Sequence, residues 1–455
     1  MAGLWPLINL TVVALSLGFI LWLLRDVRDP PTRFLCLALW LRMATSSFAD
    51  YTTSPVLGPL SINAAASLGV IGCGAALLAG DARQLTLRAL APLYVYLGLV
   101  ALSGALNRLP GQTVATLLNW TYMLIVALLL RRAARLFGCD AALRLIFPAF
   151  AMPVLLGLLS FAVGYGAETL HDGSVSYRGG FIHEAIYSFV VYSALAVALM
   201  IRWRHPLAAP FFIVLAVAAL LLGNYRTTIL ALPPLAAVVG YGVFRAAFPA
   251  RFRPGASVLA AVVVGIGVAA LIYNPPARFA ELGEALALNN MDFTRPETLT
   301  FQEQRLLSSR LYIWSKYLAD YVNGDTVVHL FGFGHGAYER KAHHLGLHAH
   351  NAYIHEIYAT GAIGLTALLA LLLATLARAL RLPDRRLASV VVATLAGFMI
   401  VCLATTPTIA IEGLILLGVL LGVATGAAPA SAAPPDPRRA GLFARPPPWR
   451  DRRSA

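Results

Sequence analysis

Histidines are the side chains of this sequence best suited to acid–base chemistry. Seven of the ten lie in one stretch, between His329 and His355. An imidazole titrates near neutral pH, so a histidine here could take the proton from an attacking hydroxyl group. We expect His350 to be that base, and we expect most of the other histidines to be polar residues of a loop.

The same stretch could instead hold a metal ion. The four most crowded histidines are His343, His344, His348 and His350. No cysteine or carboxylate lies among them, and their spacing fits no standard zinc site. We therefore expect no metal ligands and no cofactor, and a zinc site remains the weaker alternative.

Three isolated arginines indicate an anion site. They are Arg178 in Y-R-G-G-F-I-H-E, Arg226 in G-N-Y-R-T-T and Arg310 in S-S-R-L-Y-I-W. Each is flanked by glycine or hydroxyl residues, and the guanidinium fork matches two phosphate oxygens. Taken singly, each could equally be an arginine that reaches from an apolar segment to the membrane surface. Together they predict a site for a phosphate group.

The stretch from residue 332 to residue 365 adds backbone features to these side chains. A G-x-G-x-G run begins at Gly332, where the backbone could approach a ligand closely. His335, inside this run, is a candidate substrate-binding residue. Asn351 is expected to cap a helix whose N-terminus favours anions and is a further substrate-binding candidate. The G-x-x-G step at 361–364 is expected to allow close helix packing.

Composition shows what must position these residues. The 455-residue chain is 59% hydrophobic and only 12% charged, with a mean hydropathy of +0.74. Soluble domains carry about 25% charged residues, so these values exclude a soluble protein and predict an all-α polytopic membrane protein. The N-terminal apolar run lacks a preceding positive charge and a cleavage site, so we expect a retained helix. We expect 12 or 13 membrane-spanning helices, at about 4–24, 33–49, 58–80, 87–105, 112–130, 143–164, 184–201, 206–222, 228–245, 257–273, 352–377, 388–404 and 411–426.

Arginines mark alternate loops of this pattern. Arginine-rich segments follow the first, third, fifth, seventh, ninth and eleventh spans and fill the C-terminal tail. Positive loops face the cytoplasm, so the net charge of +14 is a sign of topology and predicts no nucleic-acid partner. Arg178, Arg226 and Arg310 then lie on the opposite, periplasmic face. Within the spans, Arg42 and Glu412 are functional candidates, or else an internal ion pair or interfacial residues.

These signals divide the chain into four parts. Residues 1–273 form ten helices with short loops, and 274–351 form a large periplasmic catalytic loop. Residues 352–426 form the last transmembrane helices, and 427–455 form a disordered cytoplasmic tail. Within the loop, 300–322 is amphipathic and predicts a helix lying over the membrane face.

In order along the chain, these motifs resemble the O-antigen ligase and polymerase family of bacterial envelopes. The resemblance covers about 165–425 and is carried by R-x-G at Arg178, Arg226 between two helices, R-x-x-x-W at Arg310, then G-x-G and His350-Asn351. It departs from the family after Arg178, where His183-Glu184-Ala185 replaces His-Pro-Asn, and before Arg226, where tyrosine replaces serine. The resemblance implies a GT-C-type glycosyltransferase in the bacterial inner membrane, with its active site facing the periplasm.

The resemblance also implies partners and a reaction. The donor would be an undecaprenyl-pyrophosphate-linked glycan and the acceptor lipid A–core oligosaccharide, both held among membrane lipids. Pyrophosphate is a good leaving group and needs no general acid, so arginines and one base are sufficient. We expect inverting displacement without a metal. Alternatives within the family are an O-antigen polymerase and a protein O-oligosaccharyltransferase. A lipid-linked sugar flippase or transporter is the alternative from another class.

Overall fold

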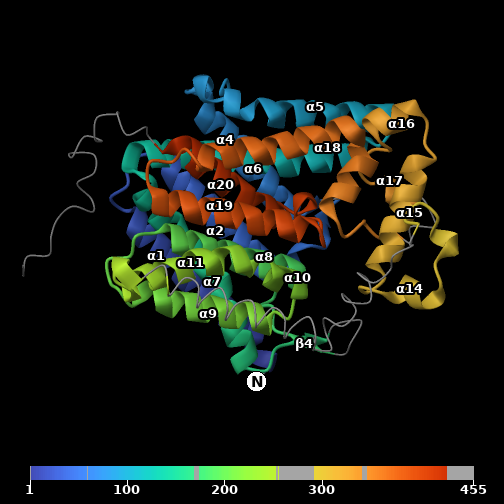
Figure 1. Cartoon of the computed structure of the whole chain (residues 1–455). Coiled ribbons are helices and arrows are strands. Elements are labelled where there is room, and N and C mark those ends of the chain that lie inside the picture. The colour runs from blue at the N-terminus through green and yellow to red at the C-terminus, as the bar shows by residue number, and fades with distance from the viewer. Residues whose placement is uncertain are drawn as a thin grey trace, which may run out of the picture.

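The chain is helical nearly throughout the residues that the computed structural model describes, which are 2–58, 60–168, 174–252, 255, 292–340 and 346–427 (Figure 1). Seven helical segments are long and apolar enough to cross a membrane. The chain is therefore an all-α, multi-pass membrane protein. The seven are α1 (Trp5–Leu24), α4 (Ile62–Ala79), Arg88–Leu106 including α5 (Ala91–Leu106), α6 (Pro110–Phe137), α7 (Cys139–Ala162), α18 (Ala352–Ala379) and α19 (Arg385–Cys402).

The other predicted spans coincide with helices that are shorter or more polar. The shorter apolar ones are α8 (Glu184–Met200), α9 (Ala208–Leu222), α11 (Leu232–Ala247) and α20 (Ile411–Gly426), while α2 (Pro30–Ser47) contains two arginines. The span expected at 228–245 is divided into α10 (Arg226–Leu230) and α11, which has prolines in its first turn. The span expected at 257–273 and the expected tail beyond residue 427 lie outside the described residues.

Short elements fill the connections between the helices. Two antiparallel hairpins pair β1 (Pro55–Leu57) with β2 (Leu60–Ser61) and β3 (Ala167–Glu168) with β4 (Val175–Ser176). Short α-helices are α3 (Ala49–Thr52), α14 (Phe301–Arg305), α15 (Arg310–Val322), α16 (Thr326–Phe331) and α17 (Ala337–Arg340). The 3-10 turns are η1 (Ala2–Leu4), η2 (Ala82–Gln84), η3 (Arg88–Leu90), η4 (Ala250–Phe252), η5 (Pro296–Thr298) and η7 (Pro407–Ile409).

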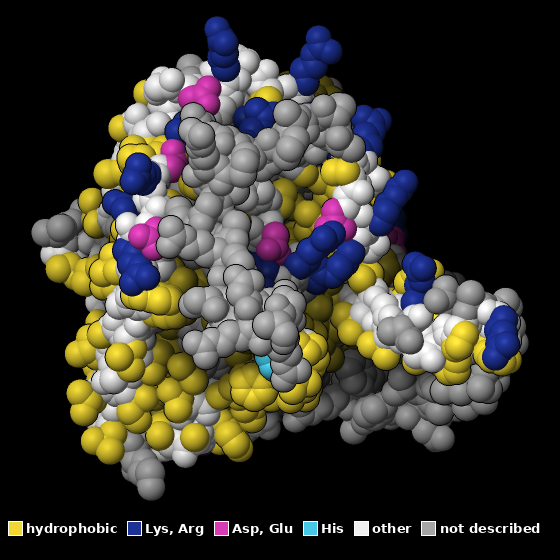
Figure 2. All heavy atoms as spheres, turned by 90° about the vertical axis from the view of Figure 1, so that its left-hand side faces the viewer, with side chains coloured by type: hydrophobic (Ala, Val, Ile, Leu, Met, Phe, Trp, Pro, Cys, Tyr) yellow, Lys and Arg dark blue, Asp and Glu magenta, His cyan; other side chains and the backbone are white. Residues whose placement is uncertain are grey.

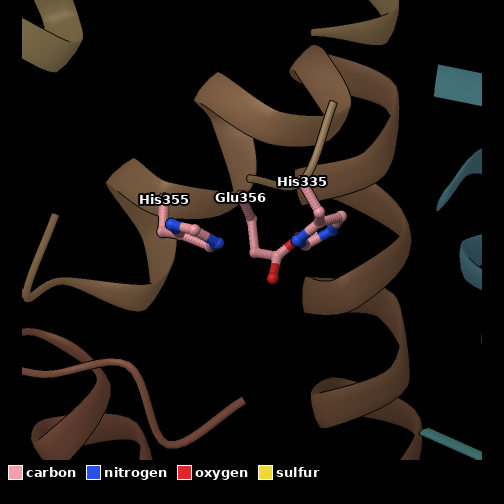
Figure 3. A group of neighbouring side chains, drawn as sticks. All are labelled: His335, His355 and Glu356. Atoms are coloured by element: carbon pink, nitrogen blue, oxygen red, sulfur yellow. The ribbon is translucent and has the colours of Figure 1, made fainter. Parts of the chain in front are cut away.

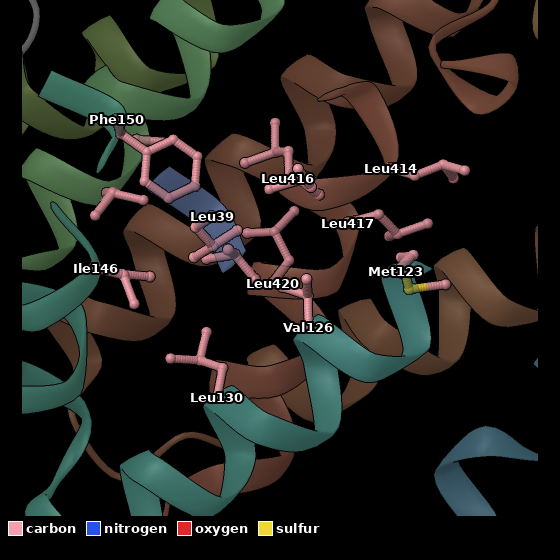
Figure 4. Close-up of a cluster of buried hydrophobic side chains, with 14 of the residues drawn as sticks. Leu39, Met123, Val126, Leu130, Ile146, Phe150, Leu414, Leu416, Leu417 and Leu420 are labelled. Atoms are coloured by element: carbon pink, nitrogen blue, oxygen red, sulfur yellow. The ribbon is translucent and has the colours of Figure 1, made fainter. Parts of the chain in front are cut away.

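Helix α20 lies in the centre of the bundle and packs against α6. Its glycines recur every four residues, at Gly418, Gly422 and Gly426. A methyl group on Gly418 or Gly422 would lie 2.9 Å from a carbonyl oxygen of α6, so only glycine permits this approach. Leucines on the other faces of α20 interdigitate with side chains of α2, α6 and α7 (Figure 4).

The arginine-rich loops gather at one end of the bundle, which we call the arginine-rich end (Figure 2). Arg132 pairs with Asp29 at 2.8 Å, and Arg202 pairs with Asp384 at the same distance. Each pair joins two loops that are far apart in sequence and were expected on the same face. Within each pair, the two loops therefore lie at the same end of the bundle, as expected from the sequence.

The other loops meet at the opposite end, which we call the α15 end after the helix that covers it (Figure 1). The amphipathic segment 300–322 is not the single helix expected, because the chain breaks between α14 and α15. Leu307, Ser308 and Ser309 have positive φ angles of 52°, 58° and 64° there. Leu109, Tyr317 and Tyr358 form a small second core that fixes α15 against α18.

Candidate functional site

The loops that carry the three arginines are hydrogen-bonded to one another at the α15 end. The Ser176 hydroxyl donates to the Gly223 carbonyl at 2.8 Å, which ties the Arg178 loop to the Arg226 loop. The Arg310 guanidinium donates to the Thr227 hydroxyl at 3.3 Å, which ties α15 to α10. Three segments that lie between 47 and 83 residues from the next along the chain therefore meet at this end.

Positive φ angles occur at or beside four of the expected site residues, Arg178, Arg226, Arg310 and His350. Arg178 is followed by Gly179 and Gly180, with φ of 58° and 83°, and Arg226 follows Asn224, with φ of 54°. Arg310 directly follows the left-handed run 307–309, and His350 itself has a φ of 47°.

These conformations are concentrated at the site. Among the described residues, six other than glycine have positive φ, and five of them are His350 or lie within three residues of Arg226 or Arg310. Non-glycine residues in this region cost about 1–3 kcal/mol each and cluster at functional sites. The strain fixes the direction from which each side chain leaves the backbone.

His348 connects His350 to the C-terminal helices. Its ring lies 4.1 Å from the ring of His350, centroid to centroid. Nδ1 of His348 accepts the backbone N–H of His350 at 3.3 Å and lies 3.1 Å from the Thr406 hydroxyl. Because a backbone N–H can only donate, Nδ1 is the acceptor and the proton of the neutral ring is on Nε2.

The charge state of His348 depends on the same surroundings. Burial lowers the pKa of His348 to about 4, and the neighbouring His183 and Arg310 add to the effect. His348 is therefore neutral at pH 7, and its pKa reports that the Arg178 loop and α15 both come close to it. His183 was not expected in the site, and its only sequence signal was its nearness to Arg178.

Asn351 begins α18, as expected for an N-cap. Its Oδ1 accepts the backbone N–H groups of Tyr353 and Ile354 at 3.0 and 3.1 Å, and its Nδ2 donates to the Leu403 carbonyl at 2.9 Å. Both ends of the amide are thus engaged within the chain. Asn351 fixes the start of the helix, and with it the position of His350.

Helix α18 is broken at Gly361, where φ is 69° and ψ is −173°. The G-x-x-G step was expected to allow close helix packing, and at Gly361 an added methyl group would lie 2.3 Å from the Leu330 carbonyl of α16. The break at Gly361 also lets the segment 332–334 enter the helix. There the backbone N–H groups of Phe333 and Gly334 donate to the carbonyls of Tyr358 and Ala359 at 2.8 and 2.9 Å. The break leaves these carbonyls without helical partners, and the entering segment satisfies them.

The glycines at 332, 334 and 336 serve this entry. All three have positive φ, and a methyl group on each would meet the protein's own backbone or side chains within 2.7 Å. Their close approach is to Ala359, Leu109 and Gln112. These glycines therefore set the position of His335, and the space beside them is filled by the protein itself and is not open to a ligand.

His335 lies beneath this turn in a buried group with His355 and Glu356 (Figure 3). The three side chains are at most 4% exposed, and Nε2 of His335 lies 3.6 Å from the carboxylate of Glu356. Burial lowers the pKa of His335 to about 4, so its ring is neutral. His355 and Glu356 were not predicted as site residues, and their spacing from His335 carries no recognised motif.

Arg42 and Glu412 form an internal ion pair, one of the three readings that the sequence left open. Glu412 accepts from Arg42 at 2.8 and 3.1 Å and from Ser46 at 2.6 Å. The pair lies on the wall of a cavity of about 600 Å³ that also contacts Phe181 and Ile182 of the Arg178 loop. Most of the remaining wall is apolar.

The structure thus brings together the backbone of the three arginine segments, His348 and His350. Arg178 is half-buried, and its guanidinium donates to the Ile182 carbonyl at 2.6 Å. The side chain of Arg226, together with His343 and His344, lies outside the described part of the structure. No protein-family model and no curated protein matches the chain significantly.

Proposed function

We propose that this protein is an O-antigen ligase of GT-C type with 12 or 13 membrane spans. It would transfer O-antigen glycan from undecaprenyl pyrophosphate to lipid A–core oligosaccharide. The reaction would take place at the α15 end, on the periplasmic face of the bacterial inner membrane. The observation that carries the proposal is the convergence of three arginine segments and His350 on strained backbone at the end opposite the arginine-rich loops.

The arginines suit a diphosphate leaving group. Arg178 and Arg310 belong to segments that meet at the loop carrying Arg226. Guanidinium groups at the position of a developing phosphate charge stabilise the transition state, and their fixed direction avoids reorganisation during the reaction. The hydrogen bonds that these arginines make within the chain are to a carbonyl and a hydroxyl, with no carboxylate competing for them in the described residues.

His350 would take the proton from the acceptor hydroxyl. Its backbone has a strained φ and donates a hydrogen bond to His348, which sets the direction in which its side chain leaves the backbone. One such base contributes about 10²–10⁴-fold to a rate. The remaining acceleration would come from holding two lipid-anchored substrates on one membrane face.

The cavity beside the Arg178 loop offers a place for the apolar part of a lipid donor. Its wall combines leucines and isoleucines with the paired, neutralised Arg42 and Glu412. An isoprenoid next to this wall would have its diphosphate near the Arg178 loop, because Phe181 and Ile182 belong to both.

The proposal is tested by transfer in vitro, with purified full-length protein in detergent or nanodiscs. Donor is undecaprenyl-pyrophosphate glycan, and acceptors are lipid A–core, a second lipid-linked glycan or a protein. We expect transfer to lipid A–core alone. His350→Ala should abolish it, and Arg310→Lys should lose most activity because the bidentate fork is lost. His205→Ala, at the arginine-rich end, is the control that should keep the wild-type rate.

Other outcomes separate the alternatives. Extension of the lipid-linked glycan would indicate a polymerase, and transfer to protein would indicate a protein O-oligosaccharyltransferase. A wild-type rate in His350→Ala would refute the base assignment. In cells lacking the protein, lipid-linked O-antigen should accumulate facing the periplasm, whereas accumulation facing the cytoplasm would indicate a flippase.

A further inference from the structure

We propose that His335, His355 and Glu356 bind a zinc ion that joins the 332–336 turn to the head of α18. This site would be structural and would take no part in the proposed transfer reaction. It differs from the zinc site considered from the sequence, which used four other histidines and no carboxylate. His335, a substrate-binding candidate from the sequence, would instead be a zinc ligand. None of the other candidate site residues belongs to this group.

The geometry brings three ligand atoms close enough for one ion. The ligand atoms of His335, His355 and Glu356 all lie within 4.8 Å of one another. A point within about 2.8 Å of all three therefore exists, and zinc ligands bind at about 2.0–2.2 Å. A closure of well under 1 Å, available by small side-chain rotations, would complete the three bonds. Figure 3 shows both rings directed towards the carboxylate between them.

Each of the three side chains has a polar atom without a partner. These atoms are Nε2 of His335, Nδ1 of His355 and Oε1 of Glu356, and all are buried. A buried polar atom left unpaired destabilises the fold, and a charged group does so more strongly. Within the described residues, no arginine or lysine pairs with Glu356. A divalent cation would supply the missing positive charge and the missing partner for all three atoms.

The surroundings hold the carboxylate ready for a metal. Its other oxygen, Oε2, accepts the hydroxyl of Tyr96 at 2.9 Å and lies 3.4 Å from that of Thr360. Hydrogen bonds of this kind orient metal-binding carboxylates and are typical of metal sites. Two imidazoles and one carboxylate are the protein ligands of zinc sites that keep a fourth position open, and a water molecule would fill that position here. Its three protein ligands distinguish this site from structural zinc sites, which have four, although the proposed role here is only to join the two segments.

Metal content tests the site without any measurement of transfer. The full-length protein is purified with a tag that contains no histidines, loaded with zinc, freed of excess metal and analysed by mass spectrometry. We expect stoichiometric zinc in the wild type and in His205→Ala, and loss of zinc in His355→Gln and in Glu356→Gln. Exchange for Co²⁺ should produce the visible absorption of a tetrahedral ion in the wild type and in His205→Ala, but not in His355→Gln or Glu356→Gln.

Thermal unfolding separates loss of metal from loss of folding. Zinc should raise the melting temperature of the metal-free wild type and of His205→Ala, and leave that of Glu356→Gln unchanged. Wild-type protein without stoichiometric zinc after loading would overturn the proposal, and so would full zinc retention in Glu356→Gln. Because every readout is metal content or stability, failure here would leave the ligase proposal standing, and the reverse also holds.

Discussion

Replacing Gly361 with alanine tests whether the break in α18 organises the site. The residue has a φ of 69°, and a methyl group there would lie 2.3 Å from the carbonyl carbon and oxygen of Leu330. These are backbone atoms, so a rotamer change cannot relieve the contact. The segment 332–334 would have to leave the break, or α18 would have to straighten.

The expected loss of stability has two parts. Gly361 combines a positive φ with an extended ψ of −173°, and a residue other than glycine there costs about 1–3 kcal/mol. Displacement of the entering segment would also lose the two hydrogen bonds from Phe333 and Gly334, worth about 0.5–1.5 kcal/mol each. Together these give about 2–6 kcal/mol. The chain provides two controls that separate the parts, Gly346 and Gly69.

Gly346 has nearly the same φ, 67°, but nothing within 4 Å of an added methyl group. Gly346→Ala should therefore show the strain of a positive φ without a clash, about 1–3 kcal/mol. Gly69 lies inside α4 in open space, so Gly69→Ala should be neutral or stabilising by up to about 1 kcal/mol. Tryptophan fluorescence during thermal unfolding in detergent would rank the three variants by stability. A Gly361→Ala protein as stable as Gly346→Ala would refute the argument.

Further predictions concern buried and titrating groups. Glu412→Leu should cost about 3–5 kcal/mol because it leaves Arg42 without its carboxylate partner. Adding Arg42→Leu should recover much of that loss, which a double-mutant cycle with both single variants would measure. The pKa of His348 in the folded protein lies below its ordinary value, so the protein should become less stable as the pH falls from 6.5 to about 4. In melting curves measured across this pH range, His348→Gln should show a weaker dependence of stability on pH. Burial raises the pKa of Asp384, but the hydrogen bonds from the Leu387 backbone N–H and from Arg202 outweigh burial and lower the pKa overall. Asp384→Asn should therefore reduce stability at neutral pH. The difference in stability between this variant and the wild type should vanish as the pH falls below 3.8.

The sequence predicted the helices well because the signals for them are local. Apolar runs of about 20 residues and the alternation of arginine-rich loops do not depend on contacts made elsewhere. The pairs Arg132–Asp29 and Arg202–Asp384 confirm that loops assigned to one face share one end. The break between α14 and α15 was missed because 300–322 is amphipathic across the left-handed residues that divide it.

The candidate site was predicted only in part because its geometry is made by tertiary contacts. The order of motifs selected Arg310 and His350, whose backbone the structure places at one end of the bundle. Sequence reasoning could not find Glu356, which lies one turn into an apolar helix and meets His335 only because Gly361 breaks that helix. It could not distinguish a packing glycine from a hinge either, because both occur in G-x-x-G.

The two carboxylates buried in the bundle are stabilised in different ways. Glu412 is neutralised by Arg42 and held by Ser46, so its charge is balanced within the chain. Glu356 has hydroxyl donors and a neutral imidazole, with no basic side chain paired to it in the described residues. An uncompensated carboxylate in an apolar interior is too costly to stay charged, so it must bind a cation or bind a proton.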